Sequence, residues 1–600
     1  GAYHFERVFP VDPKTEKRTR EAGMHLWYIV RFDKDTDLKE AARQLRKLGE
    51  ISKIQSNPTI RRAYDPKKKP LYLSASDLQH VTRTSEGLTF NDPGLKHQWH
   101  YQNTGSYDFV KEGAEAIAGA DVNCGEAWKL CKGDPTIIVA VLDEGVMWNH
   151  PDLIGNMWTN EAEEIGSTED KDGNGYKGDR YGYNFVKNTG VISWTSAEDT
   201  GHGTHVAGTI AAVNGNNKGV GGIAGGDGTE NSGVKIMTCQ LFDGAYGCTL
   251  AAEAKAIKYA ADNGAVILQC SWGYNSPDAN EALGYTPGPK DEQDWENQYP
   301  LEKEALDYFI HNAGSPNGVI DGGLAIFASG NEYAPSSSYP AGYSKCISVS
   351  AIAADFTPSS YTNYGEEITL CAPGGDGDYY GTPGVADDEF AWEGKTQGLI
   401  LSTAIKNGQP AYAYMEGTSM ACPHVSGVAA LGLSHAVKER RHFKVAEFIE
   451  LMKETANDQF YNFYDEKVEK LYYYNHTTFG APPTLMNLIE RKGKMGRLVD
   501  AGALLKAIGN HGSDMIVPNV YLATGKSTSI DLARYFIDGE SLNYSCTVAN
   551  ENIATTSVDK TILTINGIAD GSTTVTIQAG SKSQTITITV RKNAGGSGWL

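Results

Sequence analysis

The fold prediction starts from GTSMACPHVSG, residues 417–427, which place Ser419 just after a glycine at the start of a helix of small, apolar residues. Pro423 is expected in the first helical turn, where a missing N–H costs little, and Gly427 lets the helix pack closely. A hydroxyl at such a helix start lies near backbone N–H groups and the positive end of the helix dipole, which favour an anionic tetrahedral intermediate. The segment therefore predicts a nucleophile site.

Two further segments supply an acid and a base. TIIVAVL, residues 136–142, is a continuous β-branched run typical of a buried parallel strand, and Asp143 follows at its carboxyl end. Open α/β sheets place their chemistry at that edge. GHGTHVAGT, residues 201–209, contains His202 and, about one turn later, His205. A serine nucleophile needs such a base and an acid that orients it.

Together these segments resemble those of the subtilisin-like serine proteases, the subtilase family, whose catalytic residues follow in the order Asp, His, Ser. The resemblance implies that Ser419 attacks, that His202 is the base and that Asp143 orients it. His205 is then expected to be a packing or hydrogen-bonding residue. Glu144 departs from the family, in which a small residue is more usual after the acid. The implied fold class is α/β, a subtilisin-like parallel sheet covered by helices on both faces.

The resemblance also implies the groups that bind the substrate. An apolar strand at residues 324–330 precedes Asn331, whose side chain is expected to hold the oxyanion together with the Ser419 N–H. The residues expected to contact the substrate are Ser271, Trp272, Gly273, Glu332 and Ser338. Trp272 is larger than the usual aliphatic residue and is expected to narrow the P1 pocket, unless it is a core aromatic. Two preferences for the substrate's P1 residue stay open: an apolar side chain, or a lysine or arginine attracted by Glu332.

Composition limits the classes of partner. The 600 residues carry a formal net charge of −21, so a nucleic acid is a poor candidate partner because phosphate binding needs a basic face. No uninterrupted apolar stretch reaches the length of a membrane span. Nine cysteines are few for this length and do not indicate a disulfide scaffold, although Cys239 and Cys248 could close a loop.

The chain is predicted to divide into four parts. Residues 1–88 resemble the second half of the ferredoxin-like α+β prosegment that chaperones and inhibits subtilases, with strands at 25–32 and 51–54 around a helix at 38–48. A processing junction is expected near Arg62 to Asp65, and a plain α/β appendage is the alternative. Residues 89–511 form the catalytic domain, and 512–592 show the period-two alternation of an all-β sandwich resembling bacterial immunoglobulin-like modules. Residues 593–600 are expected to be a flexible tail.

Two segments of the catalytic part have open roles. Residues 275–323 are interpreted as an insertion, either a lid or specificity rim, or a solvated decoration. EDKDGNGYKGD, residues 169–179, places oxygen donors around glycines as calcium loops do. The proposed ligands are Asp170, Asp172, Asn174 and Asp179 through their side chains and Tyr176 through its carbonyl. A turn without metal is the alternative, and catalysis itself is expected to need no cofactor.

The sequence therefore predicts a serine endopeptidase that hydrolyses proteins or peptides through an acyl-enzyme. The location is expected to be extracytoplasmic, whether secreted, periplasmic or at the cell surface, and the source bacterial. Two alternatives stay open. One is a catalytically silent surface adhesion or scaffold protein, which would not need all four of Asp143, His202, Ser419 and Asn331. The other is a serine esterase or peptide ligase with the same acyl-enzyme chemistry.

Overall fold

The computed structural model describes residues 2–60, 70–73, 89–105, 116–314, 318–377, 398–457, 460–464, 469–472, 484–509, 517, 519–536 and 539–591. Contacts divide the chain into two compact units, Gly1–Lys506 and Ala507–Leu600, and each is described by itself. The expected junction near Arg62 to Asp65, the expected boundaries at residues 88 and 511, and the tail at 593–600 lie outside the described residues.

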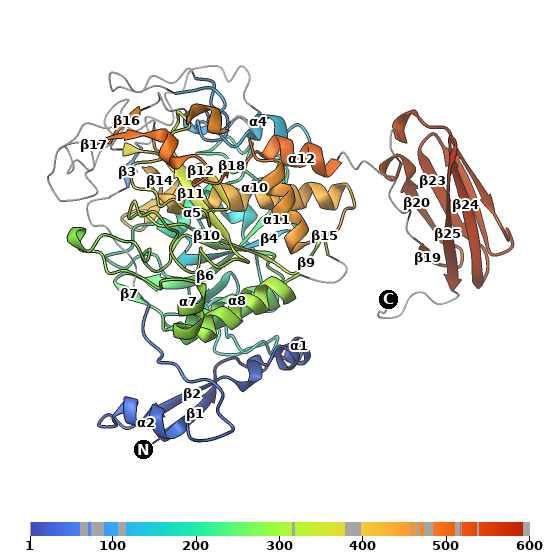
Figure 1. Ribbon diagram of the computed structural model, residues 1–600. Coiled ribbons are helices and arrows are strands. Elements are labelled where there is room, and N and C mark those ends of the chain that lie inside the picture. The colour runs from blue at the N-terminus through green and yellow to red at the C-terminus, as the bar shows by residue number, and fades with distance from the viewer. Residues whose placement is uncertain are drawn as a thin grey trace. The chain divides into compact units, whose positions relative to one another are not determined.

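A nine-stranded sheet forms the centre of the first unit, in the order β18-β12-β11-β10-β8-β4-β6-β5, with β7 paired to β6 (Figure 1). Its strands are β4 (Ile138–Glu144), β5 (Gly182–Asn184), β6 (Lys235–Asp243), β7 (Tyr246–Gly247), β8 (Ile267–Cys270), β10 (Leu324–Ala328), β11 (Ile347–Ile352), β12 (Leu370–Pro373) and β18 (Arg497–Leu498). All neighbours pair in parallel except β7, which is antiparallel. Strands such as β8 and β10 are buried throughout, as expected of a sheet covered on both faces.

Two helix layers cover this sheet. Helices α5 (His202–Ala211) and α10 (Thr418–Lys438) pack against each other and against the central strands, while α6 (Leu250–Asp262) and α8 (Pro300–Asn312) form a second packed pair, preceded by α7 (Glu292–Gln298). The α/β fold class is thereby confirmed. Because α8 is largely buried against α6 and β10, this part of residues 275–323 is a structural layer and not a lid. Within the described residues, none of the helices combines the length and apolar character that a membrane crossing needs.

Apart from the N-terminal region, further helices and strands up to residue 509 lie outside this sheet and the helices named above. They are β3 (Leu71–Tyr72), α4 (Cys124–Ala127), β9 (Ile320–Asp321), β13 (Ile400–Lys406), β14 (Gln409–Met415), β15 (Phe443–Lys444), α11 (Val445–Glu454), β16 (Glu469–Tyr472), β17 (Thr484–Asn487) and α12 (Ala501–Gly509). All nine cysteines lie in the described residues and carry free thiols, so the considered Cys239–Cys248 bridge is not formed.

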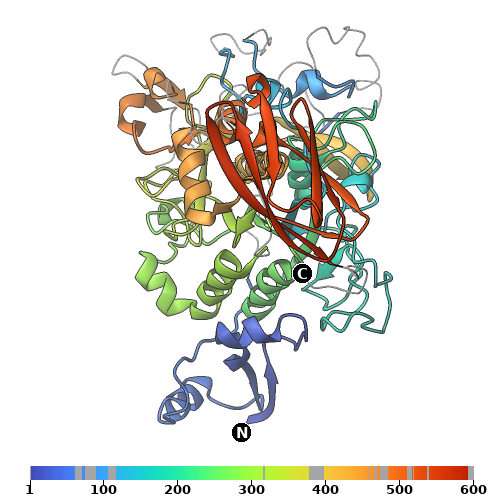
Figure 2. The ribbon, with the colours of Figure 1, turned by 90° about the vertical axis from the view of Figure 1, so that its right-hand side faces the viewer.

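The N-terminal region belongs to the first unit and lies beside the helices α6 and α8 (Figures 1 and 2). It contains β1 (Ala2–Arg7) paired antiparallel with β2 (Tyr28–Phe32), together with α1 (Glu16–Glu21) and α2 (Leu38–Leu45). The strand expected at 51–54 is not formed: those residues have no strand partner in the described part of the chain and run as irregular chain. The expected strand at 25–32 begins only at Tyr28, because Met24–Leu26 form a turn of 3-10 helix.

The second unit is an all-β sandwich with its own core. One sheet has the order β19-β25-β24-β21, and the other β20-β23-β22. The strands are β19 (Val520–Ala523), β20 (Ser527–Asp531), β21 (Tyr544–Val548), β22 (Ala554–Asp559), β23 (Ile562–Gly567), β24 (Gly571–Ala579) and β25 (Lys582–Arg591). Along β24, Thr573, Val575, Ile577 and Ala579 are buried while their neighbours are more exposed, which is the period of two that the sequence displays.

Candidate active site

An acid and an imidazole meet at the carboxyl edge of the sheet. Asp143 is the penultimate residue of β4, and His202 is the first residue of α5. The His202 Nδ1 atom lies 2.8 Å from Asp143 Oδ1 and 2.9 Å from Asp143 Oδ2. The Asp143 side chain is 4% exposed and that of His202 21%, so the imidazole lies at the surface and the acid beneath it. This geometry keeps the proton on Nδ1 and leaves Nε2 to act as a base.

Ser419 is the second residue of α10 and is partly exposed. Its hydroxyl donates to the Ser271 carbonyl at 3.2 Å, and the Ser271 hydroxyl donates to the Ser419 carbonyl at 2.7 Å. Pro423 lies inside α10 and not in its first turn, which corrects the expected position. Because proline has no N–H, it cannot bond the carbonyl four residues earlier, which is that of Ser419. The Ser271 hydroxyl replaces this missing helical donor.

Asn331 follows β10 and contacts the residue before the serine. Its side-chain oxygen accepts from the Thr418 N–H at 2.9 Å and from the Thr418 hydroxyl at 2.8 Å. With the oxygen so occupied, the amide nitrogen Nδ2 is the donor that this side chain can offer to a ligand. A Cβ atom at Gly417, where φ is +146°, would lie 3.8 Å from that nitrogen and 3.5 Å from the Ser419 N–H. A glycine here leaves room beside both donors.

The residues expected to bind substrate divide into two groups. Gly273 faces Ser338, because a Cβ atom at Gly273 would lie 3.1 Å from the Ser338 hydroxyl. The Trp272 indole instead donates to the Leu142 carbonyl at 2.8 Å and packs edge-on against Phe327, so it is partly buried against the hydrophobic core. Its expected narrowing of the pocket stays a prediction.

Glu332 is held by a neighbour that sequence reasoning did not identify. Its carboxylate accepts from the Asn363 amide, and the Asn363 side-chain oxygen accepts from the Glu332 N–H at 3.0 Å. Burial raises the pKa of the Glu332 carboxyl, although the Asn363 amide opposes this rise. Such a carboxyl is less available to attract a lysine or arginine than an exposed one.

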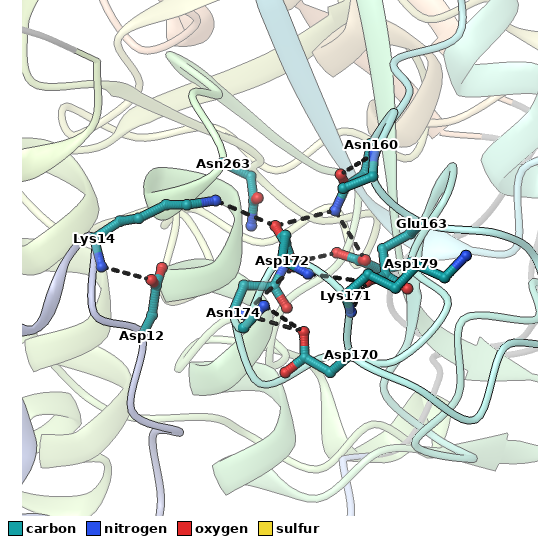
Figure 3. Close-up of polar contacts among 12 residues, drawn as sticks. Asp12, Lys14, Asn160, Glu163, Asp170, Lys171, Asp172, Asn174, Asp179 and Asn263 are labelled. Carbon is teal, nitrogen blue, oxygen red and sulfur yellow. Dashed lines mark hydrogen bonds and ion pairs between the residues drawn. The ribbon is translucent and has the colours of Figure 1, made fainter.

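The acidic loop brings together part of the expected metal-ligand set (Figure 3). Oxygen atoms of Glu163, Asp172 and Asp179 all lie within 4.8 Å of one another. Burial raises the pKa of Asp179 to about 6, and the neighbouring carboxylates of Asp172 and Glu163 add to the rise. Opposite them, the Lys14 ammonium lies 3.5 Å from Asp172 Oδ2. Clustered carboxylate oxygens are hard donors that suit calcium.

The other expected ligands have different contacts. The two carboxylate oxygens of Asp170 accept from backbone N–H groups of the loop, at 2.9 Å from Gly173 and 2.8 Å from Gly175, so Asp170 shapes the turn. Asn174 donates to Asp179 at 3.0 Å and accepts from the Tyr176 N–H at 2.7 Å. Glu163, which lies outside the alternating run at 169–179, was not identified from the sequence.

Comparison with known proteins agrees with this architecture. The model of the subtilase family, Peptidase_S8, matches residues 134–474. Halolysin from Haloferax mediterranei is 30% identical over 369 residues, which are 62% of this chain and 54% of halolysin. Thermitase from Thermoactinomyces vulgaris is 30% identical over 306 residues, or 51% of this chain and 77% of thermitase.

A calcium-dependent protease from a Nostoc strain is 30% identical over 352 residues, which are 56% of this chain and 43% of that protein. The chain spans about half the length of the curated relatives that it matches first, at 54% and 44%. The family model nevertheless covers more than half of this chain, from just before β4, which contains Asp143, to beyond α10, which contains Ser419. This chain belongs to the subtilase family.

Proposed function

We propose that the chain is a serine endopeptidase in which Asp143, His202 and Ser419 form the catalytic triad. The observation that carries the proposal is the contact of both Asp143 carboxylate oxygens with His202 Nδ1, at 2.8 and 2.9 Å. A buried carboxylate in this position orients the imidazole and stabilises it once it is protonated. His202 Nε2 then removes the Ser419 proton as the hydroxyl oxygen attacks the peptide carbonyl.

The attack produces a tetrahedral oxyanion, for which we assign the Ser419 N–H and the Asn331 Nδ2 group as donors. The position of Ser419 in the first turn of α10 supports this role, because the first N–H groups of a helix have no partner within the helix. His202 passes its proton to the leaving amine, and water then hydrolyses the acyl-enzyme in the reverse sequence of steps.

Labelling with a fluorophosphonate tests the proposal, with Ser419→Ala as the control. The wild-type chain should be labelled and the variant should not, whereas an unlabelled wild-type chain would favour the silent scaffold. Comparing the rates of peptide and ester hydrolysis separates a peptidase from an esterase. Hydrolysis of the peptide, and not transfer to an added amine, separates a peptidase from a ligase. A relative is named an extracellular serine protease, and we propose that this chain also acts outside the cytoplasm on proteins or peptides.

We further propose that residues 1–88 act as a prosegment. The support is a strand-like contact near the start of α6, where the Ile60 N–H donates to the Cys248 carbonyl at 2.8 Å and the Leu250 N–H donates to the Pro58 carbonyl at 2.9 Å. A Cβ atom at Gly247 would lie 1.9 Å from the Ile60 carbonyl oxygen, so glycine permits this approach. Main-chain pairing of this kind is how an extended peptide adds to an exposed strand edge.

Co-expression tests this role. Residues 89–600 should fold poorly alone and should recover active yield when residues 1–88 are supplied as a separate chain. If residues 89–600 alone gave a normal yield of active enzyme, and residues 1–88 added separately did not inhibit it, residues 1–88 would be an appendage and not a prosegment. The sandwich of the second unit is proposed to be a spacer or stabilising module.

A structural calcium ion is proposed at Glu163, Asp172 and Asp179. The three converging carboxylates support it, and two relatives are named calcium-dependent proteases. Calcium should raise the melting temperature by mass action, and Asp172→Ala should remove that rise. Glu169→Gln is the matched control, because Glu169 is an exposed carboxylate of the same loop. An equal rise in all three proteins would exclude this site.

A further inference from the structure

Glu144, the residue after the proposed triad acid Asp143, is a buried carboxylate that needs hydrogen-bond partners and has them. Its side chain is 2% exposed, although a carboxylate is costly to bury without partners. One oxygen, Oε2, accepts from the His202 N–H at 2.9 Å. Both oxygens lie 3.2 Å from the Thr200 backbone nitrogen and 3.3 Å from the Thr200 hydroxyl. The buried carboxylate therefore binds the backbone of the histidine itself.

The start of α5 lacks a side chain that could do this locally. Its N-cap residue is Gly201, which has φ of +75° and no capping side chain. The first N–H groups of a helix have no intrahelical acceptor and normally receive one from a capping side chain. Glu144 supplies this acceptor from a different element, β4, and its negative charge also suits the positive end of the helix dipole.

The pairing of β4 with β6 is irregular at the point where two consecutive residues of β4 contact the same helix. Successive side chains of a regular strand point to opposite faces, yet Asp143 reaches the imidazole and Glu144 the backbone at the start of α5. The register of β4 against β6 shifts between them, because Asp143 pairs with Gln240 but Glu144 with Phe242. The extra residue, Leu241, is in β6, and such a bulge changes the local twist at which the two strands end.

The backbones also approach closely at this point. A Cβ atom at Gly203 would lie 2.3 Å from the Glu144 carbonyl oxygen and 3.3 Å from the Asp143 Cβ atom. The end of β4 therefore contacts the first turn of α5 through its main chain and through two carboxylates. Asp143 sets the orientation of the imidazole ring, and Glu144 sets the position of the backbone from which that ring extends.

We infer that Glu144 is a positioning residue for the base His202, an inference that rests on the proposed function. Proton transfer from Ser419 requires Nε2 within about 2.6–3.2 Å of the hydroxyl oxygen, and a displacement of 1 Å costs on the order of a hundredfold in rate. Glu144 acts through His202 and not on the substrate, so it governs the chemical step and not substrate binding.

Three variants of the full chain test the inference, each assayed with a chromogenic peptide and with a fluorophosphonate. Glu144→Ala removes the acceptor, whereas Glu144→Gln keeps an oxygen of the same reach. Glu198→Ala is the control, because Glu198 is an exposed carboxylate in the loop that leads to α5. We expect kcat to fall about ten- to a hundredfold in Glu144→Ala and less than tenfold in Glu144→Gln, with KM within about threefold and Glu198→Ala unchanged.

Two results would overturn the inference. One is wild-type kcat and labelling rate in Glu144→Ala; the other is a glutamine variant as impaired as the alanine variant with KM raised in parallel, which indicates a general loss of structure. If Glu144→Ala fails to fold, Glu144→Gln decides the question: a reduced kcat with unchanged KM supports the inference, and wild-type kcat and labelling rate overturn it. An unlabelled wild-type chain would instead reject the proposed function, so the two failures are distinguishable.

Discussion

Replacement of Phe9 tests whether the N-terminal region shares the core of the catalytic part. Phe9 is 0% exposed and belongs to a core cluster with Tyr176, Tyr183 and Tyr259, whereas Phe5, four residues earlier, is 62% exposed. Removing a fully buried phenylalanine costs about 3–5 kcal/mol through lost apolar burial and the cavity left behind. An exposed position changes stability by less than about 0.5 kcal/mol. Phe9→Ala should therefore destabilise the protein strongly and Phe5→Ala hardly at all.

Polar contacts of the same segment make the effect extend beyond the N-terminal region. Arg18 donates to Asp262 Oδ1 at 2.9 Å and to the Tyr308 hydroxyl at 3.0 Å, which joins α1 to both α6 and α8. Loss of Phe9 should then raise hydrogen exchange in α6 and α8 as well as in β1 and β2.

The assay is hydrogen exchange and urea unfolding of the full chain in a Ser419→Ala background, which prevents self-cleavage. Equal midpoints for Phe9→Ala and Phe5→Ala would refute the argument. Faster exchange confined to residues 2–32 would also refute it, because the region would then open by itself.

Three further predictions follow from the site and its surroundings. Asn331→Asp keeps an acceptor for the Thr418 N–H but loses the Nδ2 donor. In a peptide assay kcat should fall about 10²- to 10³-fold, which is the range measured for the same kind of change in subtilisin. An unchanged kcat would remove Asn331 from the proposed oxyanion site. Burial raises the pKa of the Glu253 carboxyl and raises that of its neighbour Glu302 to about 7. The stability that this pair contributes is therefore present below pH 4.5 and is lost as the pH rises toward 7. Calorimetry should find a smaller loss of stability over this range in Glu253→Gln, and a pH dependence identical to that of the wild type would contradict the prediction. Lys14→Met removes an ammonium group 3.5 Å from Asp172, a proposed calcium ligand. The affinity for calcium, measured by titration calorimetry, should therefore rise, but only a few-fold, because the Lys14 side chain is 67% exposed. A weaker affinity would count against the proposed calcium site.

The fold and the residues assigned to chemistry could be predicted because each depends on a short local pattern. An apolar strand that ends in an acid places Asp143 at the edge of the sheet, and a glycine before a helix of small residues places Ser419 in the first turn. Both patterns involve only residues that are close in sequence, so they can be recognised without knowledge of the tertiary structure. The contact of Asp143 with His202 needs the β4–α5 packing and could only be expected through the family resemblance.

Contacts between distant segments could not be predicted in this way. Glu163 joins Asp172 and Asp179 because the chain turns back on itself, and no periodicity marks such a turn. The strand expected at 51–54 has suitable apolar residues but has no partner strand among the residues that the structure describes. Lys14 reaches Asp172 across more than 150 residues of sequence, which charge alone does not indicate.

Ser271 and Trp272, which are expected to contact the substrate, also connect the segments that carry the proposed triad. Ser271 exchanges hydrogen bonds with Ser419, and the next residue, Trp272, donates to the carbonyl of Leu142, which precedes the acid Asp143. Since Asp143 in turn contacts His202, a change at 271 or 272 can displace both ends of the proposed triad. Substitutions meant to alter specificity at these two positions should therefore change kcat together with KM. Gly273 and Ser338, the other expected substrate contacts named here, have no such contacts with the proposed triad among the described interactions, so changes there should act mainly on KM.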